Sequence, residues 1–243
     1  GQRSSRIMRD PALAFAILLL AGAPAAALVG DAAPAEWTIA RPAVMVFSSH
    51  GQCSGVVLAQ DLVLTAAHCV VAATNVKIVG HIAAAPFQLA DVTKVALHPQ
   101  YDAAAWPTAD LALLKLSKQL PTGFARAFLG TRAVAVSDRL IVIGYGVATQ
   151  GDNKSAGTPR MATLTVTAHS DNVITLRDAG GGNISGCIGD SGAPAFAVRG
   201  GVPALVGVVS RGHCGGSSLV IPFARYRDWI FETARRFGSP LDP

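Results

Sequence analysis

After Gly30 the chain becomes a succession of short apolar runs separated by Gly, Pro, Asp and Asn, and this pattern limits what it can fold into. Many short strands at regular spacing, with turn residues between them, are typical of an all-β sandwich or barrel. The expected strands are Val44–Phe47, Gly55–Leu58, Leu62–Leu64, Val76–Val79, Val92–Leu97, Leu111–Leu116, Leu140–Ile143, Thr163–Thr167, Val173–Leu176, Ala195–Val198, Leu205–Val209 and Leu219–Ile221.

The C-terminal stretch has the periodicity of a helix. Apolar residues recur there at helical spacing with charged residues between them: Phe223, Tyr226, Trp229, Ile230, Ala234 and Phe237. Pro222 suits the first turn of such a helix and Gly238 suits its end. The sequence therefore predicts a helix over residues 222–238 that packs on the β-structure.

An uncharged stretch over residues 11–30 predicts an exported protein. Its apolar part is short, and the three alanines at 25–27 satisfy the small-x-small rule of signal peptidase. The alternative is an uncleaved membrane anchor, because a stretch of this length could just span a bilayer. Gly22 and Pro24 weaken a spanning helix, so we predict a cleaved signal peptide over residues 1–27.

Four cysteines in an exported chain suggest two disulfides, for which three pairings are possible. The local pairing joins Cys53 to Cys69 and Cys187 to Cys214. Each of these loops would contribute on the order of 3 kcal/mol in the chain-entropy model.

The charge balance argues against a nucleic-acid partner. The whole chain carries a formal net charge of +5, and removal of residues 1–27 leaves 17 basic and 14 acidic side chains. This balance is mild, and no basic run accompanies it.

The segment Cys187-Ile188-Gly189-Asp190-Ser191-Gly192 contains a candidate nucleophile. A serine hydroxyl is a weak nucleophile at neutral pH and needs a base and a rigid turn rich in N–H donors. Gly189 allows a turn that a residue with a Cβ would not adopt, in which the N–H groups of Gly189 and Ser191 converge on one oxyanion. The alternative is an ordinary surface turn.

A histidine and an aspartate each lie at one end of an expected apolar strand. His68 follows an apolar strand, and Asp110 precedes a buried one. Each has a simpler explanation by itself, His68 as a core histidine and Asp110 as a turn residue. A carboxylate against such an apolar run nevertheless requires a partner.

Together these residues resemble the chymotrypsin–trypsin family of serine proteases, in particular secreted peptidases of bacterial type. The matching motifs are Thr-Ala-Ala-His-Cys at 65–69, Asp-Leu-Ala-Leu-Leu-Lys-Leu at 110–116 and Gly-Asp-Ser-Gly at 189–192. Their order of His, Asp and Ser differs from the orders in α/β-hydrolases and subtilisins. The likeness extends over residues 28–237.

The resemblance implies two packed six-stranded antiparallel β-barrels and a C-terminal α-helix. The N-terminal barrel would cover residues 28–118, the C-terminal barrel 119–221 and the helix 222–238. The active site would lie in the cleft between the barrels. The family's disulfides match the pairing Cys53–Cys69 beside the histidine and Cys187–Cys214 beside the specificity pocket.

The resemblance also assigns roles to site residues. His68 would take the Ser191 proton and return it to the leaving amine, and Asp110 would hold the imidazole tautomer. The N–H groups of Gly189 and Ser191 would form the oxyanion hole.

An activation step follows from the same resemblance. Leu28-Val29-Gly30-Asp31 is similar to the mature start of the family, in which a freed α-amino group pairs with the aspartate before the nucleophile. We therefore expect cleavage after Ala27 to place the Leu28 ammonium against Asp190. The alternative is a zymogen step elsewhere.

The resemblance further indicates a neutral specificity pocket. Ser185 would form its base, Ser218 its far wall, and Ser210 would pair with substrate backbone, while Gly186 and Gly212 would leave room. Such a pocket suits an apolar or aromatic P1 residue, the residue on the acyl side of the scissile bond. Arg211, in place of the family's tryptophan, and His213 could instead favour an acidic residue, or both could be solvated.

The sequence thus predicts a secreted serine endopeptidase, periplasmic or extracellular, that acts as a monomer on protein or peptide substrates. An inactive protease-like binding module is the alternative. We expect no stable membrane association after signal removal and no cofactor. No metal is expected, because residues 75–81 lack paired acidic ligands and the histidines lack zinc spacing.

Overall fold

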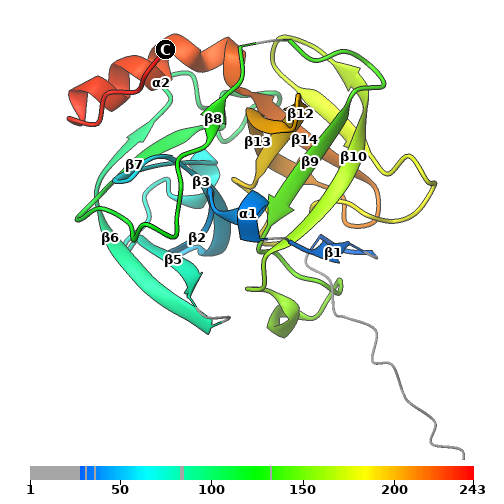
Figure 1. Ribbon diagram of the computed structural model, residues 1–243, viewed down its shortest axis with the longest axis horizontal. Coiled ribbons are helices and arrows are strands. Elements are labelled where there is room, and N and C mark those ends of the chain that lie inside the picture. Colours follow the sequence, from blue (N-terminus) through cyan, green and yellow to red (C-terminus); the bar gives the residue numbers. More distant parts are fainter. Residues whose placement is uncertain (1–27, 31, 36, 83–84, 132) are drawn as a thin grey trace, which may run out of the picture.

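Two β-barrels lie side by side, and a C-terminal helix crosses one edge of the pair (Figure 1). The structure is a computed structural model, and it describes residues 28–243 except 31, 36, 83–84 and 132. The predicted signal peptide lies outside the described residues.

The first barrel contains six antiparallel strands that close in the order β2-β3-β4-β7-β6-β5. Its strands are β2 (Ala43–Ser48), β3 (Gly51–Ala59), β4 (Leu62–Thr65), β5 (Lys77–Ile82), β6 (Ala85–Leu97) and β7 (Ala112–Leu116). β4 is buried on both faces. Val63 packs inside the first barrel, and Leu62 and Leu64, on the opposite face, pack against the second barrel. This explains why its sequence is a continuous apolar run rather than an alternating one.

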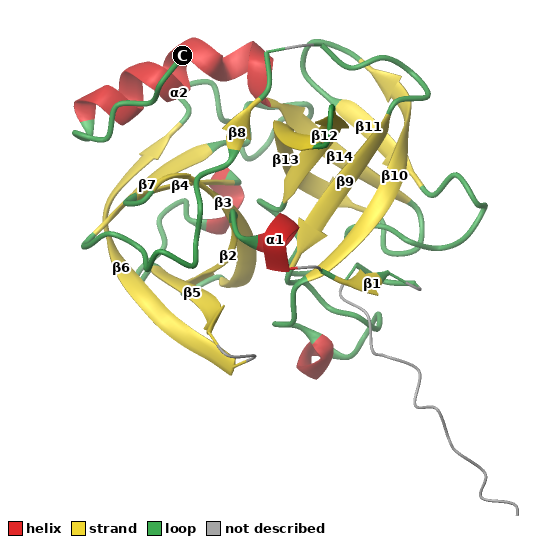
Figure 2. Ribbon diagram, in the orientation of Figure 1, coloured by secondary structure: helices red, strands yellow, loops and turns green. Residues whose placement is uncertain are grey.

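The second barrel closes through β9-β10-β11-β14-β13-β12, since β12 pairs with β9. Its strands are β9 (Arg139–Gly144), β10 (Arg160–His169), β11 (Ile174–Arg177), β12 (Pro194–Arg199), β13 (Val202–Gly212) and β14 (Ser217–Pro222). The expectation of two six-stranded antiparallel barrels is confirmed (Figure 2).

Several short elements extend this plan. β1 (Ala33–Pro34) pairs with β10, and β8 (Phe128–Leu129) runs parallel to β13. α1 (Trp37–Ala40), η1 (Ala67–Cys69) and η2 (Asn153–Ser155) are single short turns of helix. None was expected, because segments of two to four residues carry no periodicity. The domain boundaries at 118/119 and 221/222 stay predictions.

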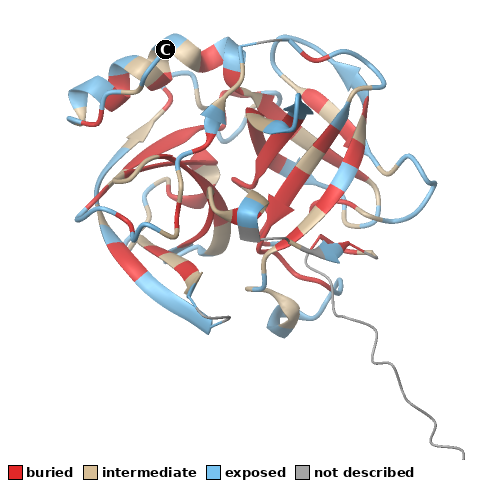
Figure 3. Ribbon diagram, in the orientation of Figure 1, coloured by how far each residue is buried: buried red, intermediate tan, exposed pale blue. Residues whose placement is uncertain are grey.

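A shared hydrophobic core joins the barrels, and buried residues are frequent in the strands of both (Figure 3). It combines buried residues of the first barrel, such as Met45 and Leu64, with Ile143, Tyr145 and Phe196 of the second. The Tyr145 hydroxyl also donates to the Ala43 carbonyl across the boundary, at 3.2 Å. Side chains carried by the two barrels are therefore held in a fixed mutual position.

The predicted helix is α2 (Phe223–Arg236). Phe223, Tyr226, Ile230 and Ala234 are buried at helical spacing and belong to the shared core. His98 of the first barrel packs edge-on against Tyr226 and Trp229, with ring centroids 4.8 Å apart in both cases. The helix therefore packs against both barrels and stabilises their contact.

Candidate active site

His68 lies at the boundary between the barrels, in the short helix η1 that follows β4. Its Nδ1 is 2.6 Å from Asp110 Oδ2, and its backbone N–H donates to Asp110 Oδ1 at 2.9 Å. Because the Asp110 carboxylate accepts this hydrogen bond, Nδ1 carries the proton, and Nε2 remains available as a base. The structure thus brings together two of the residues that the sequence singled out.

Asp110 is 2 % exposed and receives a third hydrogen bond, from Ser210 Oγ of β13 at 2.5 Å. Burial by itself would raise the pKa of the carboxyl group. The hydrogen bonds from His68 and Ser210 and the charge of His68 outweigh burial, so the pKa of Asp110 lies below its ordinary value. This carboxylate remains ionised next to the imidazole.

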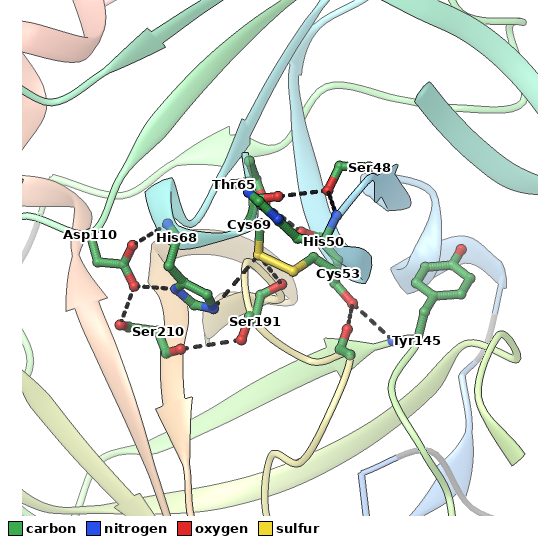
Figure 4. Close-up of a disulfide and its surroundings, with 12 residues drawn as sticks. Ser48, His50, Cys53, Thr65, His68, Cys69, Asp110, Tyr145, Ser191 and Ser210 are labelled. Carbon is green, nitrogen blue, oxygen red and sulfur yellow. Dashed lines mark hydrogen bonds and ion pairs between the residues drawn. A yellow bond between two sulfur atoms is a disulfide. The ribbon is translucent and has the colours of Figure 1, made fainter. Parts of the chain in front are cut away.

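Ser191 comes from the second barrel, and its hydroxyl donates to the Ser210 carbonyl at 3.3 Å. Cys69 Sγ lies 3.8 Å from His68 Nε2 and 4.0 Å from the Ser191 carbonyl oxygen (Figure 4). Both residues therefore contact the same sulfur atom. The Ser191 hydroxyl makes no hydrogen bond to His68 in the described part of the chain. Such bonds are often absent without substrate and form in the Michaelis complex.

The turn before Ser191 is held from both sides. The Ile188 carbonyl accepts from Val147 N–H at 2.8 Å, and the Gly189 carbonyl accepts from Ser54 Oγ at 2.8 Å. Because the peptide is planar and trans, the Gly189 N–H points away from Val147. Neither this N–H nor that of Ser191 has a partner among residues 28–243 as described. Gly189 has a φ of 92°, which favours glycine there.

Ser54 is a site residue that the sequence did not indicate. It is fully buried, and its backbone N–H donates to the Ser191 carbonyl at 2.8 Å. Its Oγ accepts from Tyr145 N–H at 3.1 Å while donating to Gly189. Ser54 therefore links the first barrel to the turn of the second barrel that carries Ser191. A serine beside Cys53 gave no signal, because its role depends on backbone groups far away in the chain.

Asp190 is fully buried next to Ser191. Its carboxylate accepts from the N–H groups of Gly146 and Cys187, each at 2.9 Å, and from that of Leu28. Burial raises the pKa of Asp190 to about 7, although these three hydrogen bonds lower it. A Cβ on Gly146 would lie 2.6 Å from the Asp190 carboxyl carbon, so only glycine fits there.

The expected pocket residues meet, but the space between them is smaller than predicted. Ser185 Oγ donates to the His213 carbonyl at 3.1 Å, and Gly186 N–H donates to Ser218 Oγ at 2.7 Å. A Cβ on Gly212 would overlap the Gly186 carbonyl oxygen and lie 2.9 Å from its carbon. The expectation that these glycines leave open space is therefore wrong, because the two backbone walls touch.

A family model described as Trypsin matches residues 32–230, most of the chain. The chain belongs to the trypsin family. As a trypsin-family protein it is a serine endopeptidase, which agrees with the fold and with the convergence of His68, Asp110 and Ser191.

Individual relatives are consistent with this assignment. Human kallikrein-15 is 28% identical over 214 residues, which cover 76% of this chain and 82% of the relative. Trypsin-3 of Salmo salar is 28% identical over 206 residues, covering 76% and 84%. The mouse brain serine protease neuropsin shares the fold, with a TM-score of 0.71, 20% identity and coverage of 84% and 99%. These relatives are animal proteins and give no support to a bacterial type.

Both disulfides of this trypsin-family protein have the expected local pairing. Cys53–Cys69 lies beside His68, and Cys187–Cys214 joins the segment before Ser191 to the segment that follows β13. Two disulfides suit a protein made for an oxidising compartment, which fits secretion.

One group of potential metal ligands occurs among the described residues: Cys53, His68 and Cys69. The two sulfurs are joined in a disulfide, so neither is a thiolate that could bind a metal. Within the described ranges, no helix has the length and apolar character needed to cross a membrane.

Proposed function

We propose that this serine endopeptidase uses Ser191 as its nucleophile, His68 as its base and Asp110 as the group that orients the base. The observation that carries the proposal is the chain of contacts from Asp110 to His68 Nδ1 and, through Ser210, to the Ser191 hydroxyl. It supplies a nucleophile, a base and an orienting carboxylate, which is the requirement for acyl transfer by serine.

In the acylation step the Ser191 oxygen attacks the scissile carbonyl carbon and its proton moves to His68 Nε2. The imidazolium is stabilised by Asp110, which stays ionised because its pKa is low. The C–N bond then breaks as His68 returns the proton to the leaving amine. Water attacks the acyl-enzyme by the same route, and Ser191 is regenerated.

The negative charge on the carbonyl oxygen needs donors, and the N–H groups of Gly189 and Ser191 are the candidates. Support comes from the fixed orientation of the Ile188–Gly189 peptide, because its own carbonyl and the following carbonyl of Gly189 both accept hydrogen bonds. One such donor is typically worth about 3–4 kcal/mol of transition-state stabilisation.

The pocket at Ser185 favours an apolar P1 residue over a basic one. Ser185 is buried and carries no charge, and the other predicted lining residues, Ser210, Gly212 and Ser218, are uncharged too. A buried ammonium or guanidinium without a counter-charge would be costly there. Since Gly212 lies against Gly186, a small side chain such as alanine suits the pocket better than an aromatic one.

Activation by cleavage before Leu28 is the second part of the proposal. Leu28 is fully buried and its N–H already donates to the Asp190 carboxylate. Cleavage would convert this amide into an ammonium, which would pair with the buried carboxylate and fix the turn that holds Gly189. A signal peptide over residues 1–27 would make export and activation a single event, in the periplasm or outside the cell.

The alternative function is that of an inactive binding module, a monomer that binds proteins or peptides. It is favoured only by the close approach of Gly212 to Gly186, which narrows the pocket. A peptide-hydrolysis assay on the chain that begins at Leu28 separates the two. We expect cleavage after small apolar residues by the wild type and none by Ser191→Ala. Cleavage by both would point to a contaminant, and cleavage by neither, with both folded, would favour the binding module.

A further inference from the structure

The edge of β13 next to Ser191 is open. β12 pairs with β13 only as far as Val208, and the Val209 backbone is bonded to Gly192 and Ala193. From Ser210 onward the described chain provides no strand on that side, whereas β14 continues along the other side to Gly212. An open strand edge of this kind binds an extended peptide by backbone hydrogen bonds.

The position of the nucleophile sets the register of such a peptide. The Ser191 hydroxyl lies at the Ser210 carbonyl, so a scissile carbonyl within reach of it places P1 opposite Ser210. In an antiparallel pair the preceding residue, P2, lies opposite Arg211, and P3 lies opposite Gly212. Residues directly opposite each other have their side chains on the same face, so P2 and P4 face the Arg211 side and P3 faces away.

Arg211 is exposed, and its guanidinium is held across the cleft. The Cζ atom lies 4.5 Å from the ring centroid of Trp106, which belongs to the loop before Asp110 in the first barrel. The Arg211 backbone belongs to the β13–β14 ladder, but its guanidinium makes no hydrogen bond or ion pair in the described part of the chain. The indole therefore orients its planar N–H donors, and these are free to bind a carboxylate in the bidentate manner.

The two carboxylates that act together with Arg211 on Tyr101 have other hydrogen-bond partners and form no ion pair with Arg211. That of Asp102 accepts from the Ala104 N–H at 2.8 Å, and that of Asp110 accepts from His68 and Ser210. Burial and the charges of Asp110 and Asp102 raise the pKa of Tyr101, and the charge of Arg211 partly offsets this rise. His213, further along the same edge, is exposed and adds no negative charge.

We propose that Arg211, held on Trp106, selects peptide substrates that carry a carboxylate side chain at P2 or P4. The proposal rests on the proposed function, and it makes the substrate class more specific: a small apolar P1 residue preceded by Asp or Glu on the Arg211 face. Arg211 acts on substrate binding and takes no part in the chemical step.

The test compares internally quenched peptides that are identical except for Glu or Gln at P2, P3 or P4. For the wild type we expect the ratio of kcat/KM for Glu over Gln to be about three- to tenfold at P2 or P4 and near unity at P3. Arg211→Gln should bring every ratio to about unity. Because each ratio is taken within one variant, an overall change in activity cancels.

Two further variants sharpen the result. Trp106→Leu removes the platform and should reduce the ratio, whereas Arg235→Gln, which removes an exposed arginine on α2, should leave it unchanged. Cleavage without any Glu preference, or a preference that survives Arg211→Gln, would overturn the Arg211 proposal alone. Absence of both cleavage and fluorophosphonate labelling would overturn the proposed function together with it.

Discussion

Two buried aspartates lie within the same site, and their environments push their ionisation in opposite directions. Asp110 is 2 % exposed and Asp190 is 0 % exposed, so burial penalises both carboxylates. The pKa of Asp110 nevertheless falls below its ordinary value, whereas burial raises that of Asp190 to about 7. The difference lies in the partners.

Asp110 faces an imidazole that can carry a positive charge, and Asp190 faces only backbone N–H groups. Hydrogen bonds from neutral donors do not compensate the burial of Asp190. A cation would stabilise this second carboxylate, and under the proposed activation the Leu28 nitrogen, which already donates to Asp190, would supply it.

The largest effect is expected on removing the charge of Asp110. Asp110→Asn should lower kcat by about 10⁴-fold, because the amide no longer fixes the imidazole with its base nitrogen toward Ser191. Steady-state kinetics on a cleavable peptide provides the measurement. Asp228→Asn, an exposed aspartate on α2, is the matched control and should leave kcat unchanged. A loss of less than tenfold in Asp110→Asn would contradict its assigned role.

The second prediction concerns stability and pH in a chain whose Leu28 amide is still acylated, for example by a Gly-Ser extension. An unfolded Asp loses its proton near pH 3.8, whereas folded Asp190 keeps it until about pH 7. The folded state therefore binds more protons in this window, and the free energy of unfolding should decrease as pH rises, by on the order of 4 kcal/mol from this group.

The matched chain begins at Leu28, and its ammonium should keep Asp190 ionised and remove this decrease. Urea denaturation between pH 4 and pH 8 measures both chains, with Ser191→Ala in each to prevent autolysis. Identical pH profiles for the two chains would show that Leu28 does not pair with Asp190.

The third prediction replaces Asp190 itself. In the chain that begins at Leu28, Asp190→Asn should lower kcat about 100-fold, because the turn that aims the Gly189 N–H loses its ion pair. The same substitution in the extended chain should remove the part of the stability decrease between about pH 4 and pH 7 that comes from Asp190, since an amide does not titrate. Unchanged kcat in the first chain would separate Asp190 from the oxyanion hole.

The smallest effect is expected from Ser210→Ala. It removes one of three hydrogen bonds to Asp110, and one bond to a charged group contributes roughly 1.5–3 kcal/mol. We expect kcat to decrease about tenfold. The pKa of Asp110 should rise, so stability should be lost at a higher pH on acidification than in the wild type. A pH titration of unfolding would reveal the shift, and its absence would mean that this bond does not hold Asp110 ionised.

Motif reading predicted His68, Asp110 and Ser191 because their chemistry demands particular residue types in a particular order. The short apolar runs predicted an all-β sandwich or barrel, because strands buried on both faces need them, as in β4 (Leu62–Thr65). The arrangement as two six-stranded barrels came from the family resemblance. Ser54 escaped prediction because any short polar residue could occupy its position in the sequence. The contact of Gly212 with Gly186 also escaped, because glycine is compatible with both open and closed backbone.

The proposed catalytic site is tested by covalent labelling of Ser191 with a fluorophosphonate in the folded chain that begins at Leu28. Intact mass and peptide mapping would locate the adduct. We predict one adduct on Ser191 in the wild type, none in Ser191→Ala and strongly slowed labelling in Asp110→Asn. An unlabelled wild type, folded and beginning at Leu28, would contradict the claim that these residues form a working catalytic site.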